Sequence, residues 1–164
     1  MTSYSTVLNA FLRRVEKDYK FFNYFGLSDS EAMQLARERA LGYMDEAVAL
    51  ITINGMPQID FSERDEPLGA FTADLTAQEV YILSSLMYRQ YLDRDIAYLA
   101  TLSVNYTSTD LRVFDPSNAR KTFASLYNSV CEECDRLVDT YKNTDRVSGA
   151  YRGINFDQYD TAES

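Results

Sequence analysis

Four stretches of the chain place apolar residues three or four positions apart, which is the spacing that one buried face of an α-helix requires. This spacing predicts helices over residues 4–22, 29–51, 77–102 and 117–142. Two of them start with a capping box, in which a hydroxyl side chain and a glutamate three positions later satisfy each other's backbone amides. These are Ser28 with Glu31 and Thr76 with Glu79. The pattern predicts a mainly α fold, a four-helix bundle-like domain.

The helix predicted over 117–142 carries the most regular apolar stripe of the four. Leu126 and Leu137 lie on this stripe, so we expect that replacing either with Ala costs about 2 to 5 kcal/mol of stability. Cys131 and Cys134 lie on the same stripe, in the middle of the helix. We therefore expect them to be small core residues without a disulfide bond.

Residues 52–74, between the second and third predicted helices, lack helical spacing and contain two glycines and two prolines. Ile53, Ile59 and Phe61 alternate with polar neighbours, as in short strands. We predict a long, partly extended loop inserted into a helical domain of residues 1–142, and interpret it as a docking loop or a small hairpin. A surface excursion without a partner is the alternative.

Residues 143–164 show no helical period but contain the aromatic residues Tyr151, Phe156 and Tyr159. We predict an extended C-terminal arm that folds onto a partner rather than onto its own domain. These aromatic residues, together with Ile53, Ile59 and Phe61 of the loop, are the predicted partner-binding residues. Deletion of residues 146–164 should then leave the thermal midpoint of the subunit nearly unchanged and abolish assembly.

The composition excludes several kinds of catalytic and metal site. The chain has 164 residues, with 25 acidic and 16 basic side chains, a formal net charge of −9 and no histidine. Catalytic groups built on histidine, and metal sites with histidine ligands, are therefore excluded. Two cysteines alone cannot complete a tetrahedral zinc site. We expect no catalytic residues, no metal, no cofactor and no enzymatic activity. An acid–base enzyme is an alternative hypothesis, which needs two converging carboxylates in a pocket, and the sequence shows no such convergence.

The charge and the hydropathy also limit the partners. An acidic chain without a basic run is not suited to gripping nucleic acid. No run of 18 apolar residues is present, and the first residues lack the pattern of a secretory signal. We expect a protein that is made in the cytoplasm and does not enter a membrane.

The order of these segments resembles the small head–tail connector proteins of tailed bacteriophages, also called adaptor or head-completion proteins. The resemblance rests on the sequence from Asp74 to Ile96, in which a capped Asp-Leu-Thr-x-x-Glu entry opens a helix rich in methionine and aromatic residues. It rests also on a final helix over residues 118–141 that a polar tail follows. It covers about residues 4–142.

This resemblance implies a structural virion protein rather than an enzyme. Its subunits would form a ring, often of twelve, below the portal and around the DNA channel at the head–tail junction, after assembly in the host cytoplasm. The partners would be the portal protein, the next neck or tail component and other copies of the chain. DNA would pass through the channel without specific binding, which an acidic ring favours. The alternative is a small cytoplasmic helical-bundle regulator that binds a protein partner through its third helix and tail.

Overall fold

Within the residues that it describes, the computed structural model has five helices and three two-residue strands. It describes residues 1–22, 24, 26–105 and 116–152, and the side chains of 19, 20 and 97–120 lie outside the description. The helices are α1 (Tyr4–Arg14), α2 (Tyr19–Phe22), α3 (Asp29–Gly55), α4 (Ala77–Asn105) and α5 (Pro116–Lys142). The strands are β1 (Thr2–Ser3), β2 (Arg64–Asp65) and β3 (Ala70–Phe71). The mainly α class that the sequence predicts is confirmed.

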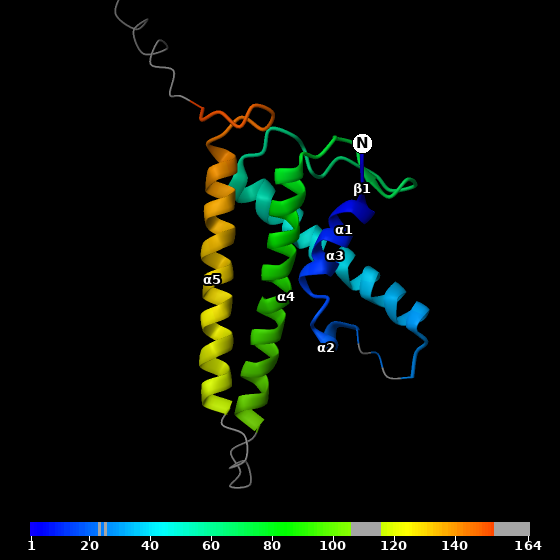
Figure 1. Ribbon diagram of the computed structural model, residues 1–164, viewed down its shortest axis with the longest axis vertical. Coiled ribbons are helices and arrows are strands. Elements are labelled where there is room, and N and C mark those ends of the chain that lie inside the picture. Colours follow the sequence, from blue (N-terminus) through cyan, green and yellow to red (C-terminus); the bar gives the residue numbers. More distant parts are fainter. Residues whose placement is uncertain (23, 25, 106–115, 153–164) are drawn as a thin grey trace, which may run out of the picture.

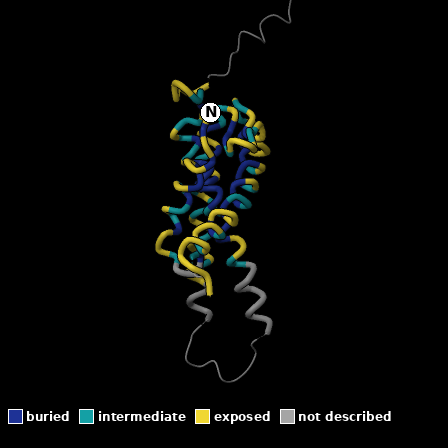
Figure 2. The backbone as a smooth tube through the Cα atoms, turned by 90° about the vertical axis from the view of Figure 1, so that its right-hand side faces the viewer, coloured by how far each residue is buried: buried dark blue, intermediate teal, exposed yellow. Residues whose placement is uncertain are grey.

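Helix α4 is the centre of the fold, since α1, α3 and α5 all pack against it. In Figure 1, α4 and α5 stand side by side and antiparallel, while α3 crosses them obliquely and its N-terminal half extends away from the pair. Helices α1 and α2 cover α4 on the side opposite α5. The buried residues therefore run through the middle of the molecule, between these layers (Figure 2).

Four aromatic rings join α1, α2, α3 and α4 at the centre of this core. Phe21 meets Phe11 at 5.6 Å and Tyr91 at 5.5 Å between ring centroids. Tyr43 lies 5.8 Å from Phe11 and 6.0 Å from Tyr91, which closes the ring of contacts. Offset and edge-on pairs of this kind add about 0.5 to 1.5 kcal/mol each beyond the burial of their surface. The cluster accounts for the close packing of the short N-terminal helices on the two long ones.

The predicted helix over 4–22 is two helices, which corrects the first expectation. Helix α1 ends at Arg14, and the chain turns through residues 15–18 before α2 begins at Tyr19. Within the turn, the Tyr91 hydroxyl donates a hydrogen bond to the Asp18 carboxylate. The turn changes the register of the helix, so that Phe21 is fully buried and Phe22, which the continuous stripe predicts as buried, is only half-buried.

The capping boxes at the second and third predicted helices are both confirmed. The Ser28 hydroxyl accepts from the Glu31 amide, and the Glu31 carboxylate accepts from the Ser28 amide. Thr76 and Glu79 form the same reciprocal pair at the start of α4. Both helices start within a residue of the predicted position, and α3 continues four residues beyond its predicted end.

The segment between α3 and α4 forms a small hairpin, one of the two roles that the sequence suggests for it. Strands β2 and β3 pair antiparallel, and β1 adds on the other side of β3, so the strand order is β1-β3-β2. The strands are not built from the residues that the alternation indicates. Ile53 belongs to α3, and Phe61 lies before β2 with its side chain only 1% exposed.

Helix α5 buries a narrower stripe than the sequence predicts. Cys134, Val138 and Tyr141 are buried, in the half of α5 that lies near both α3 and α4. Leu126 is 45% exposed and Leu137 is half-buried. The prediction of a large loss of stability for Leu126→Ala is therefore wrong, because its side chain fills no core space that would become a cavity.

Candidate functional site

The predicted partner-binding residues differ in their exposure to solvent. Phe61 belongs to the hydrophobic core and Ile59 packs against that core, so the expectation that they are free for a partner is corrected. The four main helices do not close the core without them. Ile53 and Tyr151 are exposed, as a partner contact requires. The two remaining predicted residues, Phe156 and Tyr159, lie outside the described residues.

Ile53 and Tyr151 come from distant parts of the sequence and lie at the same end of the molecule. This end holds the C-terminus of α3 and the segment that follows α5 (Figure 1). Two further apolar residues, Met56 and Val147, occupy it, and all four side chains are between 66% and 82% exposed. We call these four residues the end surface. Exposed apolar groups gathered at one place are typical of a protein–protein contact.

Met56 is in the left-handed region of backbone conformation, with φ of 43° and ψ of 58°. This conformation ends α3, and glycine or asparagine is the usual residue there, because a Cβ atom makes it costly. The segment that includes Met56 continues to Gln58, whose side-chain amide donates to the Thr144 carbonyl at 2.9 Å. A long apolar side chain in a strained position, exposed to solvent, indicates a role outside the fold of the single chain.

Residues 143–152 form a compact turn rather than an extended arm. The Asp145 carboxylate accepts from the amides of Val147 and Ser148, and Thr144 and Tyr151 form an antiparallel bridge. Backbone bonds from the Asp145 amide to Ala150 and from the Arg152 amide to Asn143 close the turn. The chain therefore stays in contact with the helical domain beyond residue 142, through this turn.

An ion pair holds the turn against the start of α4. Arg146 donates from Nε to Glu79 Oε1 at 2.8 Å and from Nη2 to Glu79 Oε2 at 2.9 Å. The same Nη2 atom donates to the Asp74 carbonyl at 2.6 Å. Tyr141 adds a hydroxyl bond to Glu79 Oε1 at 2.8 Å, and the Thr76 amide donates to Oε2 at 2.7 Å. Each oxygen of the Glu79 carboxylate thus accepts two hydrogen bonds, although the side chain is fully buried.

The environment of Glu79 keeps it ionised. Burial raises the cost of its charge, but the bonds from Arg146, the Thr76 amide and Tyr141 outweigh burial and hold the pKa of Glu79 below its ordinary value. Burial and the bond to Glu79 raise the pKa of the Tyr141 hydroxyl, which stays a donor. The bond to Glu79 raises the pKa of Arg146. Glu79, Tyr141 and Arg146 therefore anchor the turn, and their hydrogen bonds leave no open position for a substrate.

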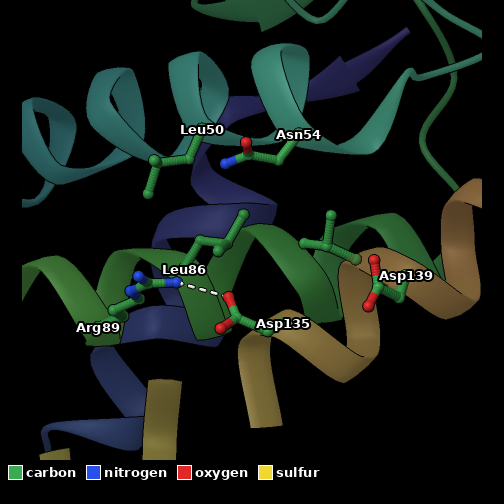
Figure 3. A pocket seen from close by; sticks show the side chains of 7 residues that line it. Leu50, Asn54, Leu86, Arg89, Asp135 and Asp139 are labelled. Atoms are coloured by element: carbon green, nitrogen blue, oxygen red, sulfur yellow. Dashed lines mark hydrogen bonds and ion pairs between the residues drawn. The ribbon is translucent and has the colours of Figure 1, made fainter. Parts of the chain in front are cut away.

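A cleft of about 410 Å³ lies between the C-terminal half of α3, α4 and α5, next to the end surface. Leu50, Leu86 and Val138 give it an apolar floor. Figure 3 shows that Arg89 of α4 reaches Asp135 of α5, and their atoms are 2.9 Å apart. Four polar side chains line the rim of the cleft, namely Asn54, Arg89, Asp135 and Asp139.

The described side chains offer little for redox or metal chemistry. Burial, opposed in part by Arg89, raises the pKa of Cys134 to about 11, so its thiol stays protonated near neutral pH. Cys131 and Cys134 are both free, as expected. Among the described residues, no group of three acidic, cysteine or histidine side chains is placed to hold a metal ion. No helix within the same residues is both long and apolar enough to span a membrane.

Sequence reasoning misses three residues of this region, Met56, Arg146 and Asp139. Met56 precedes a proline, which signals the end of a helix but not a left-handed residue. Arg146 stands in an acidic, non-helical segment, and nothing local indicates that it pairs with Glu79, 67 positions away.

Comparison with protein families, with curated proteins and with solved structures finds no match to this chain.

Proposed function

We infer that the chain is a head–tail connector subunit of a tailed bacteriophage, which assembles into a ring below the portal and around the DNA channel. The observation that carries this proposal is the end surface. Four exposed apolar residues belong to segments at one end of an acidic helical domain, namely the C-terminus of α3 and the anchored turn after α5. Subunits of stacked rings require a contact surface of this kind at an end of the molecule.

The anchor supports the same proposal, because it fixes the direction in which the chain leaves the domain. Arg146 joins the turn to the start of α4 through three hydrogen bonds. Val147 and Tyr151 lie on this anchored turn, so they are held in place before they meet a partner and lose less entropy on docking.

The charge supports the proposal as well. A net charge of −9 in each subunit, repeated around a ring, gives a channel that does not adhere to DNA. A genome can then slide through it during packaging and release. The alternative, a small cytoplasmic regulator of another protein, requires neither a ring nor this excess of acidic groups.

The test is to mix the full chain with the portal protein encoded near it and to image the particles by electron microscopy. The proposal expects an added ring below the portal. A Val147→Ser, Tyr151→Ser double variant should lose attachment, whereas Leu27→Ser, which alters an exposed leucine before α3, should retain it. A chain that remains a free monomer or dimer beside unchanged portal rings would contradict the proposal and favour the regulator.

A further inference from the structure

The cleft between α3, α4 and α5 is electronegative for a reason that lies in the backbone. Helices α3 and α5 both end beside it, at Gly55 and Lys142, and Gly55 packs against Val138 of α5. The C-terminus of each helix carries about half a negative charge. The last turn of α3 contains no basic residue to offset this charge, whereas the last turn of α5 contains Lys142.

Asp139 adds a full negative charge in the last turn of α5, where the helix dipole disfavours it. Across the described part of the chain, its carboxylate makes no hydrogen bond and no ion pair. The basic side chain of the cleft, Arg89, is already paired with Asp135. The side chains that line the cleft thus have one negative charge in excess, on Asp139.

The cleft has the features that a lysine or arginine side chain needs. The methylene stem of such a side chain packs along apolar surface, which Leu50 and Leu86 provide here. Its charged end requires acceptors, and Figure 3 shows Asn54 and Asp139 on the rim of the same cleft. A carboxylate and a guanidinium can form two parallel charge-assisted hydrogen bonds, which are stronger than hydrogen bonds between neutral groups.

Arg37 is an exposed basic side chain of the chain itself that fits this description. It is exposed on the N-terminal half of α3, and no described residue pairs with its guanidinium. Met33 lies one turn earlier on the same face and is also exposed. The two side chains present a cation beside an apolar group, and the cleft presents a carboxylate beside an apolar floor.

The positions of the two surfaces exclude a contact within one molecule. Arg37 and Asn54 lie on the same helix, about 25 Å apart along its axis. The half of α3 that bears Arg37 extends away from α4 and α5 (Figure 1). Two complementary but different surfaces on opposite sides of a subunit join head to tail, and such contacts close into a ring when the rotation between subunits allows it.

We propose that the cleft of each subunit receives Arg37 of the neighbouring copy, with Asp139 as its partner and Met33 covering the apolar floor. This inference rests on the proposed ring and names the contact that would build it. The contact consists of the N-terminal half of α3 from one copy and the C-terminal halves of α3 and α5 from the next.

A charge exchange in the full chain tests the contact. Asp139→Arg and Arg37→Asp each place like charges together, so each alone should raise the concentration needed for half-assembly by about tenfold or more. The two substitutions combined restore an opposite pair and should restore assembly. Glu132→Arg and Lys17→Asp make the same changes of charge at other exposed positions and should assemble as the wild type does.

Mass photometry measures the assembly, and circular dichroism shows that every variant is folded. Suppose that the wild type forms rings. If the folded single variants then form them equally well, or if the double variant fails to assemble, the Arg37–Asp139 contact is wrong, but the proposed ring is unaffected. If the wild type forms no ring, alone or on the portal, both the contact and the connector function are overturned.

Discussion

Replacement of Arg146 with Ala should destabilise the isolated subunit strongly, although the sequence places this residue in an arm with no role in the fold. The substitution removes two hydrogen bonds to Glu79 and one to the Asp74 carbonyl. The Glu79 carboxylate is fully buried in the wild type, and the Thr76 and Tyr141 donors that remain in the variant hold it at the same place. A buried charge is thus left without its counter-charge.

The magnitude follows from this geometry. Removal of one partner from a buried ion pair costs about 3 to 5 kcal/mol, because the remaining charge has lost its compensation. Two donors still stabilise the Glu79 carboxylate in the variant, and Arg146 itself is partly exposed. We therefore expect a loss at or below the lower end of this range, about 2 to 3 kcal/mol, which is a large part of the stability of a small domain.

Urea unfolding followed by circular dichroism at 222 nm measures this loss. Arg152→Ala is the matched control, since Arg152 lies in the same turn with an exposed side chain and should change stability by less than about 0.5 kcal/mol. The reasoning is refuted if the Arg146→Ala and Arg152→Ala proteins unfold at the same urea concentration. In that case the turn does not contribute to the folded domain, and the arm begins at residue 143, as the sequence suggests.

Further predictions concern pH, packing and strain. Folding lowers the pKa of Glu79. The ionised Glu79 side chain therefore stabilises the fold above its unfolded pKa of about 4.3, and this stabilisation is lost as the pH falls through the folded pKa. The stability gap between wild type and Arg146→Ala should narrow below about pH 4 in urea titrations, and an unchanged gap would contradict the assignment. Leu83→Ala should cost about 2 to 5 kcal/mol and Leu126→Ala less than about 1 kcal/mol by the same measurement, since only Leu83 is fully buried. Met56→Gly should raise the stability by about 0.5 to 1 kcal/mol and weaken attachment to the portal, whereas a destabilised protein would show that the left-handed residue is not strained.

The parts of the fold that local chemistry determines are those that the sequence predicts well. The capping boxes at Ser28 and Thr76 need only residues three positions apart, and both helices start where these boxes predict. The break after Arg14 is different. It depends on Asp18 and Phe21 reaching Tyr91, 70 or more positions away for each contact, and the apolar spacing continues through the turn without interruption.

The width of a buried stripe also depends on what covers it. Leu126 fits the helical spacing of α5 as well as Val138 does, but Val138 lies beside both α3 and α4, and Leu126 is nearly half exposed. Phe61 shows the converse, since a segment without helical period supplies a ring to the core. Periodicity identifies a face of an element but does not show how many neighbours pack on that face.

The candidate site is predicted only in part. Ile53 and Tyr151 are exposed, as a partner contact requires, but Ile53 lies in α3 rather than in the predicted loop. That they lie at one end of the molecule depends on the course of α3 and on the anchor at Arg146. Long-range pairs of this kind have no signal in a single sequence, because neither partner is unusual among its neighbours.

The central claim is that copies of this chain form a ring, and native mass spectrometry of the full chain tests it most directly. Spectra are recorded over a range of concentrations, with the chain alone and with portal protein added. The claim predicts one closed species whose mass is a fixed multiple of the subunit mass, formed by the chain alone or joined to the portal. Monomers or dimers at every concentration, with portal mass unchanged, would contradict it.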